Sequence, residues 1–197
     1  IGVLSFGVWA HHMFATGIDT RIQVSFMAVS LAIAVPTAVK VFNWITTMYN
    51  GSVRLTAPML FAVGAIASLI VGGITGVFLA AIPYDRLVHG TYYVVGHFHL
   101  IVGPVIASMA FAASYYWFPL ITRRLYDRRL AQVHAVLFIA GALLAFDALL
   151  VIGLGGQPRR SANYLPRWVE LQWVASAESF LMGASVPVWL YNLVQSY

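Results

Sequence analysis

The chain has no cysteine, a single lysine and few charged residues of either sign. Charged side chains make up 9% of its 197 residues, against roughly a quarter in an average soluble domain. The missing cysteines exclude disulfides and thiolate metal ligands. The scarcity of charge, together with 61% hydrophobic residues, excludes an ordinary soluble globule and indicates a protein dissolved in lipid.

The net charge of +5 comes almost entirely from arginine. A basic balance can indicate nucleic-acid binding. Here the arginines lie in loops between apolar runs, which is the pattern of membrane topology. We therefore expect membrane lipid, and no nucleic acid, around this chain.

Five long apolar runs follow an opening segment, IGVLSFGVWA, that resembles the tail of a hydrophobic helix. The runs lie near 22–49, 56–81, 91–119, 131–154 and 171–195. Each exceeds the 20 or so residues that a helix needs to cross the hydrocarbon, and none alternates as a barrel strand would. The sequence predicts an all-α, polytopic helical bundle forming a single membrane domain over 1–197. Because no leader is visible and the first residues are already apolar, we expect a part of a longer subunit.

The loop charges predict the orientation of the bundle. Arg54 and the loop near 119–130 lie on one side, which the positive-inside rule assigns to the cytoplasm. That loop carries four arginines: Arg123, Arg124, Arg128 and Arg129. The opposite side carries Arg159, Arg160 and Arg167 against the rule, which indicates an anionic partner there.

Histidines are the strongest functional signal. In His97-Phe98-His99 the two imidazoles are separated by about 200° on a helix, so they point to opposite faces and would serve two different metals. His11 and His12 lie about 100° apart if helical, so both can reach one ion. Two imidazoles do not close a site, and a third ligand must come from elsewhere. Hydrogen-bonded histidines without a metal are the alternative, favoured least for the HFH pair.

Polar residues inside two spans indicate further roles. Ser30, Thr37 and Lys40 fall on roughly one face of the first full span, a stripe suited to carrying protons. A lysine that extends to the cytoplasmic edge is the alternative. The glycines of the second span, Gly72, Gly73 and Gly76, predict close approach to a neighbouring helix.

The motifs WAHHMF, VPTAVKVFNW, GGITGV, HGTYYVVGHFH and QPRR together resemble subunit I of heme–copper terminal oxidases, in the cytochrome c oxidase branch. The resemblance covers the whole chain and matches the C-terminal half of a twelve-helix core. It implies that His11 and His12 are copper ligands. It implies that His97 ligates a high-spin heme and His99 a low-spin heme.

The resemblance also assigns the polar residues. Thr37 and Lys40 match a proton path that leads to the heme–copper site. Arg159 and Arg160 match a pair that binds heme propionates, which would explain the arginines on the translocated side.

Two departures from the family pattern stand out. In the family, His89 would be followed by Asp, and the two residues would bind Mg or Mn. Gly90 follows here, so His89 is left as the one candidate ligand of that metal in this pair. Asp85 lies in the same loop, and we expect it near the heme propionates. Asp147 lies where relatives carry apolar or amide residues, and His134 is its candidate partner.

The resemblance implies a terminal respiratory oxidase with two hemes, heme a being favoured, and copper. Electrons would pass from cytochrome c to dioxygen, forming water, with proton translocation and with other oxidase subunits as partners. A quinol oxidase is the first alternative, and a non-redox helical bundle or assembly subunit is the second. The membrane would be a bacterial or archaeal plasma membrane or the mitochondrial inner membrane.

Overall fold

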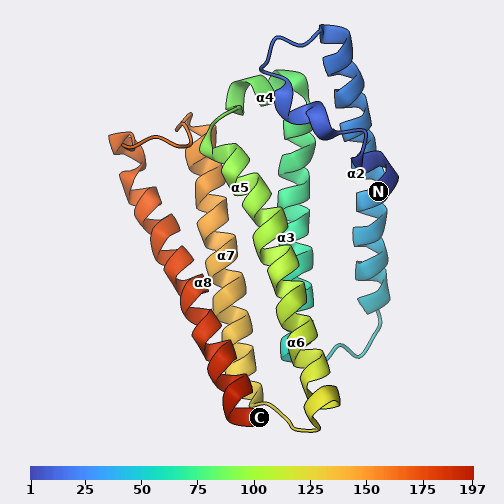
Figure 1. The fold of residues 1–197 in the computed structure, drawn as a ribbon, viewed down its shortest axis with the longest axis vertical. Coiled ribbons are helices and arrows are strands. Elements are labelled where there is room, and N and C mark those ends of the chain that lie inside the picture. Colours follow the sequence, from blue (N-terminus) through green and yellow to red (C-terminus); the bar gives the residue numbers. More distant parts are fainter.

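The computed structural model describes residues 1–197 as an elongated bundle of helices without a sheet (Figure 1). The helices, in chain order, are α1 (Gly2–Ser5), the 3₁₀ turn η1 (Trp9–Met13), α2 (Thr20–Met48), α3 (Ala57–Ala80), α4 (Ile82–Val88), α5 (Tyr92–Leu100), the π-helix η2 (Ile101–Ile106), α6 (Ala107–Thr122), α7 (Arg128–Leu154), the 3₁₀ turn η3 (Pro166–Trp168) and α8 (Val169–Ser196). The helices α5, η2 and α6 form one continuous rod. This confirms the predicted all-α class.

Each predicted apolar run is a helix whose ends differ by no more than a few residues from the predicted ones. Four helices are long and apolar enough to cross a membrane: Thr20–Met48, Ala57–Ala80, Tyr92–Thr122 and Arg128–Leu154. The fifth predicted span corresponds to α8, which is 28 residues long and lies alongside α7 but is less apolar than the other four. The protein is therefore an integral membrane protein.

Side-chain caps fix where several helices begin. The Asp19 carboxylate accepts a hydrogen bond from the Arg21 amide at 2.8 Å, and Asp127 accepts one from Leu130 N at 2.9 Å. Thr91 accepts from Tyr93 N at 3.2 Å and starts α5 just before the HFH motif. Such caps satisfy the free N–H groups of a first helical turn.

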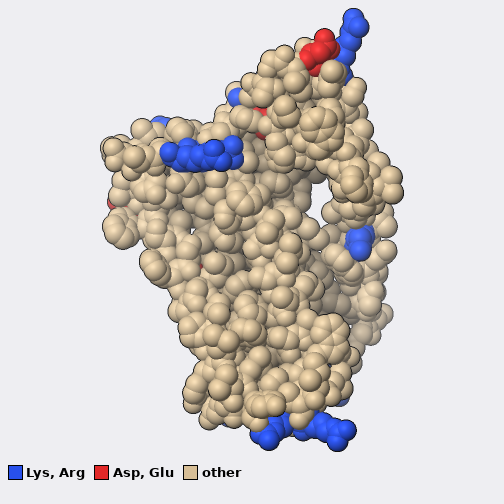
Figure 2. All heavy atoms as spheres, in the orientation of Figure 1, with Lys and Arg blue, Asp and Glu red and all other residues tan.

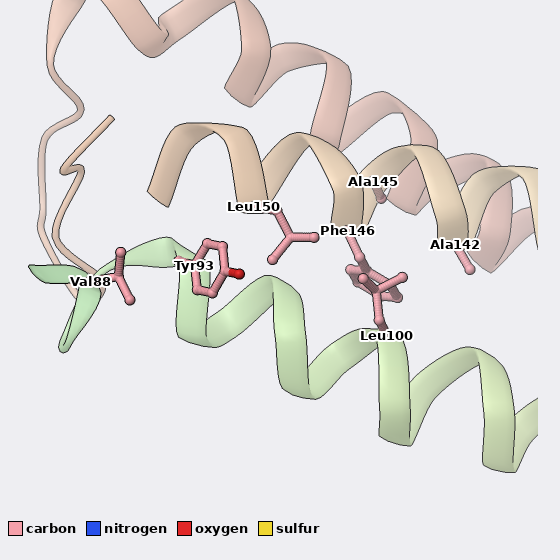
Figure 3. Close-up of a cluster of buried hydrophobic side chains, with 7 residues drawn as sticks. All are labelled: Val88, Tyr93, Leu100, Ala142, Ala145, Phe146 and Leu150. Atoms are coloured by element: carbon pink, nitrogen blue, oxygen red, sulfur yellow. The ribbon is translucent and has the colours of Figure 1, made fainter. Parts of the chain in front are cut away.

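The central core lies between α5 and α7 (Figure 3). Phe146 and Leu150 of α7 pack against α5, where Leu100 is fully buried. Gly96 permits this approach, because a Cβ there would lie 2.8 Å from the Phe146 carbonyl oxygen. Helices in lipid associate through close backbone contact at small residues, because the hydrophobic effect does not favour helix–helix contact over contact with lipid.

A second core at the lower end of Figure 1 joins α3, α6 and α7, and it corrects one prediction. His134 is fully buried there, with Nδ1 3.1 Å from the Tyr115 hydroxyl. Asp147 is not its partner, since the two residues are separated by about 20 Å along α7 at roughly 1.5 Å per residue. One carboxylate oxygen of Asp147 is buried without a hydrogen bond.

Charged side chains gather at the two ends of the bundle, and its flank is almost uncharged (Figure 2). The α6–α7 loop lies at the lower end, whereas α4 and the α7–α8 loop lie at the upper end (Figure 1). The predicted cytoplasmic arginines and the arginines of 155–170 are therefore at opposite ends, as the topology requires.

Candidate functional site

Most of the predicted site residues converge on one cavity of about 500 Å³ near the upper half of the bundle, and Lys40, His99 and Arg160 do not line it. Side chains from η1, α2, α3, α4, α5 and the α7–α8 loop form its walls. Its polar lining residues include His11, His12, Ser30, Thr37, Asp85, His89, His97 and Arg159. Residues far apart in sequence thus share one space, which no periodicity in the sequence could establish.

The His11 and His12 rings meet edge to face, with their Nε2 atoms 2.9 Å apart. The Ser30 hydroxyl donates to Phe26 O and so accepts from Nδ1–H of His11 at 3.1 Å, leaving a lone pair on Nε2. Burial, followed by the nearby His12 charge, lowers the pKa of His11 to about 4. Two imidazoles bound about 2.0 Å from one ion are roughly 2.8–3.4 Å apart, so this pair fits two adjacent positions around a metal.

His97 of α5 is oriented by α3. Its Nδ1–H donates to the Gly72 carbonyl oxygen at 3.0 Å, and the Thr75 hydroxyl donates to the same oxygen at 2.8 Å. Thr75 Oγ1 also lies 3.1 Å from Nδ1. A Cβ at Gly76 would approach the His97 ring to 2.7 Å. Nε2 of His97 is consequently left for a ligand, and its ring is held as metal-ligating histidines are.

His99 points away from that cavity. Its Nδ1–H donates to the Val95 carbonyl at 2.8 Å, and its ring centroid lies 5.1 Å from the Phe146 ring of α7. His97 thus contacts α3 and His99 contacts α7. The opposite orientation predicted from the HFH spacing is confirmed, and the Nε2 of each ring is available on its own side of α5.

The polar stripe on α2 divides into two parts. Ser30 and Thr37 line the cavity, and Thr37 donates to Ile33 O at 2.8 Å. Lys40 is exposed and does not line the cavity; its Nζ lies 5.3 Å from the Trp44 ring centroid. Of the three residues predicted to share a face, Ser30 and Thr37 therefore present their hydroxyls to the cavity, while Lys40 lies about one turn beyond Thr37 towards the lower end.

The loop predicted over 82–90 contains the short helix α4, which the sequence reading missed. His89 Nδ1 lies 3.1 Å from the Asp85 carboxylate one turn earlier. Burial raises the pKa of Asp85, and the neighbouring His89 acts in the opposite direction. Gly90 has φ +72°, a conformation that favours glycine. Asp85 is thus the hydrogen-bond partner of His89.

Arg159 and Arg160 differ in their placement. The Arg159 backbone N–H donates to Gly90 O at 2.9 Å, next to an isolated bridge between Thr91 and Pro158, and its side chain lines the cavity. Arg160 is exposed and has φ +62°. Neither guanidinium has a carboxylate partner, because the His89–Asp85 contact is the chain's one salt bridge.

No group of three or more His, Asp or Glu side chains is close enough to hold a metal ion by itself. Thr75 was missed by the sequence reading because a threonine inside an apolar run carries no pattern, although it lies in the GGITGV motif. Of the three glycines predicted to pack, Gly72 and Gly76 do so, whereas Gly73 faces open space in the cavity wall.

The geometry defines a class of protein: a membrane-embedded helical bundle in which His11, His12 and His97 line one cavity and His99 lies on the opposite face of α5. The sequence model of the family described as cytochrome c and quinol oxidase polypeptide I matches residues 1–181, and the chain belongs to this family. The predicted resemblance is thereby confirmed.

Curated relatives agree with this assignment. Cytochrome c oxidase polypeptide 1 of Halobacterium salinarum is 58% identical over 197 residues, which are 100% of this chain and 33% of the relative. Cytochrome c oxidase subunit 1 of Thermostichus vulcanus is 38% identical over 96% of this chain and 34% of its own length. The chain spans about a third of the length of these relatives.

A solved structure shares the fold. A heme–copper terminal oxidase dimer determined by cryo-EM matches with a TM-score of 0.86, over 98% of this chain and 40% of that chain, at 22% identity. At this identity the likeness concerns the arrangement of helices.

Proposed function

We propose that this chain is part of the catalytic subunit of a terminal respiratory oxidase. The subunit would pass electrons from cytochrome c through a low-spin heme to a high-spin heme–copper centre that reduces dioxygen to water. The observation that carries the proposal is that His11, His12 and His97 face one cavity while His99 faces the other side of the same helix.

The residues present fit these groups. His11 and His12 offer Nε2 atoms at a spacing suited to two ligands of one copper ion. His97 and His99 each have Nδ1 bonded to a backbone carbonyl, which leaves Nε2 for an iron. Gly73 leaves the cavity wall open where any side chain would fill it. When bound, heme and copper supply the one-electron and dioxygen chemistry that protein side chains lack.

The helix α5 fixes the relation between the two iron ligands. His97 and His99 are two residues apart on one rigid element, with Phe98 between them and its ring 4.1 Å from that of His99. This arrangement supports electron transfer between two sites held on opposite faces. The contacts with Gly72 and Val95 prevent either ring from rotating to the other face.

Residues of α2 support proton delivery to the cavity. Ser30 and Thr37 present hydroxyls to it, and Lys40 lies further towards the end that carries the α6–α7 arginines. Proton uptake from that end compensates the negative charge that an electron brings into a low-dielectric interior. Lys40, Thr37 and Ser30 are the residues that would hold or pass the proton, coupling the reaction to proton translocation.

At the upper end Arg159, and with it Arg160, would bind heme propionates through charge-assisted hydrogen bonds. The residues do not fit the doubtful Mg or Mn site: His89 is engaged by Asp85, and Gly90 supplies no carboxylate.

Cytochrome c is proposed as the electron donor because the curated relatives quoted above are cytochrome c oxidases. The family description also covers quinol oxidases. Rates of oxygen consumption by the purified complex with reduced cytochrome c and with a quinol distinguish the two. Other oxidase subunits are proposed as its stable partners.

The experiment that tests the function is a reduced-minus-oxidised optical spectrum of the assembled complex. It is recorded for the wild type, for His97→Ala and for His99→Ala. We expect His99→Ala to abolish the low-spin signal and His97→Ala to abolish the carbon-monoxide-reactive one. A wild-type complex without heme signals would overturn the proposal.

Metal analysis of the same preparations tests the copper site. We expect His12→Ala to lose copper while both heme signals persist, because His12 contributes an Nε2 to that ion alone. Gln132→Met serves as the control and should retain the metal, because Gln132 is exposed and lies in the first part of α7, away from the cavity.

A further inference from the structure

A second hollow, of about 340 Å³, lies between α7 and α8. One residue of α7 and five of α8 line it: Leu149, Gln172, Ala175, Ser176, Ser179 and Phe180. Its lining mixes amide and hydroxyl groups with apolar side chains, although it lies inside the bundle's apolar flank. Neither the proposed copper site nor the His97 cavity includes any of these residues.

Gln172 is the unsatisfied donor in this hollow. Its side chain is 8% exposed, and Nε2 is buried without any hydrogen-bond partner. The two serines donate to backbone carbonyls, Ser176 to Gln172 O at 2.8 Å and Ser179 to Ala175 O at 2.7 Å, and neither hydroxyl oxygen accepts a hydrogen bond from Nε2 of Gln172. A buried amide donor left unpaired is costly, so such groups almost always have a partner.

The hollow and His99 lie on the same side of α7. Gly141 packs against α8, because a Cβ there would lie 2.7 Å from Glu178 O, whereas Phe146 packs against α5. On a helix of 3.6 residues per turn, Leu149 falls between these two faces. Leu149 is also one turn from Phe146, whose ring lies 5.1 Å from that of His99. The hollow is therefore adjacent to the side on which His99 offers its Nε2.

We propose that Gln172 donates a hydrogen bond from Nε2 to an oxygen at the edge of the low-spin heme bound by His99. This inference rests on the proposed function. The acceptor is a porphyrin-edge oxygen, either a propionate carboxylate or a formyl carbonyl. A donor at the edge withdraws electron density or compensates negative charge, so it favours the reduced iron and raises the reduction potential. Gln172 is thus a positioning and tuning residue for the electron-accepting heme.

The test uses the full-length subunit in its assembled complex. Gln172→Met keeps the length of the side chain but removes the donor, and Gln132→Met is the matched control, since Gln132 is exposed and donates to Leu55 O. The midpoint potential of the low-spin heme is measured by optical redox titration. Carbonyl and carboxylate bands are followed by vibrational difference spectroscopy.

We expect Gln172→Met to lower the equilibrium constant for heme reduction roughly three- to tenfold, the effect of one neutral hydrogen bond. At 59 mV per tenfold for one electron this is about 30–60 mV. A shift of the carboxylate band identifies a propionate as the acceptor, and a shift of the conjugated carbonyl band identifies a formyl. Either shift supports the proposal, and Gln132→Met should show neither.

An unchanged potential together with unchanged bands, in a Gln172→Met complex that retains its low-spin heme, would overturn the inference and leave the proposed function intact. A wild type that lacks a low-spin heme would overturn both. Should Gln172→Met fail to assemble, Gln172→Leu, which is uncharged and also lacks a donor, is measured by the same two criteria.

Discussion

Single atoms decide the orientation of the histidines that matter. The Gly72 carbonyl holds Nδ1 of His97, the Val95 carbonyl holds Nδ1 of His99, and the Ser30 hydroxyl holds Nδ1 of His11. In each case the second nitrogen is left for a ligand. A change that moves one of these rings by less than an ångström should alter binding without altering the fold.

Gly76→Ala tests this sensitivity at His97. The added methyl would lie 2.7 Å from the ring, which is held by Gly72 and Thr75 and cannot move without losing a hydrogen bond. Overpacking of this kind costs about 1–3 kcal/mol, so we expect carbon-monoxide affinity of the high-spin heme to fall about tenfold or more. Spectral titration checks it. Gly183→Ala, where nothing lies within 4 Å of the added Cβ, should behave as the wild type.

Tyr115→Phe tests the buried histidine of the lower core. It removes the hydroxyl bonded to His134 Nδ1 and leaves a fully buried ring with no partner, because Nε2 already has none. We expect a loss of about 1–3 kcal/mol in unfolding free energy, measured by thermal denaturation in detergent. Tyr116→Phe, at a side chain 62% exposed, is the control; equal stability of both variants would contradict the assigned role.

At the scale of elements, helix pairs approach through small residues. The α7–α8 pair is close at Gly141, where a Cβ would lie 2.7 Å from Glu178 O and 2.8 Å from Met182 N. These are backbone atoms, which yield less readily than the end of a side chain. The α7–α8 hollow that Gln172 lines depends on this spacing.

Gly141→Leu should therefore separate α7 from α8. We expect destabilisation of at least about 2 kcal/mol, since neither backbone can give way without moving a helix, together with a broadened low-spin heme band. Denaturation and optical spectra check the two effects. Gly183→Leu, on an open face of α8, adds the same side chain at no such contact and should leave both observables unchanged.

At the scale of the whole molecule, charged side chains lie mostly at the two ends, and the flanks expose many apolar side chains. Only 37 of 197 residues are buried, so much apolar surface is left to contact lipid or other helices. The positive-inside rule predicts that the lower end, with its four arginines in the α6–α7 loop, faces the cytoplasm, and the arginines of the 155–170 loop lie at the other end.

The absence of cysteine allows this orientation to be measured directly. Single cysteines are introduced at Ser52 in the α2–α3 loop and at Ala162 in the α7–α8 loop, both exposed. In intact cells a membrane-impermeant maleimide should label Ala162→Cys and should label Ser52→Cys only after permeabilisation. The parent without either introduced cysteine controls for background, and the reverse pattern would contradict the topology.

The sequence by itself determined the class, the helices and the two-sided HFH arrangement, because hydrophobic length and a 3.6-residue period act locally along the chain. It also indicated the family through its histidine and arginine motifs. Only the tertiary structure decided which side chains share a space: that Ser30 and Thr37 reach the cavity but Lys40 does not, and that Tyr115 of α6 partners His134 of α7. These pairings depend on how helices rotate and slide against one another, which is fixed by glycine contacts between distant segments and leaves no period in the sequence.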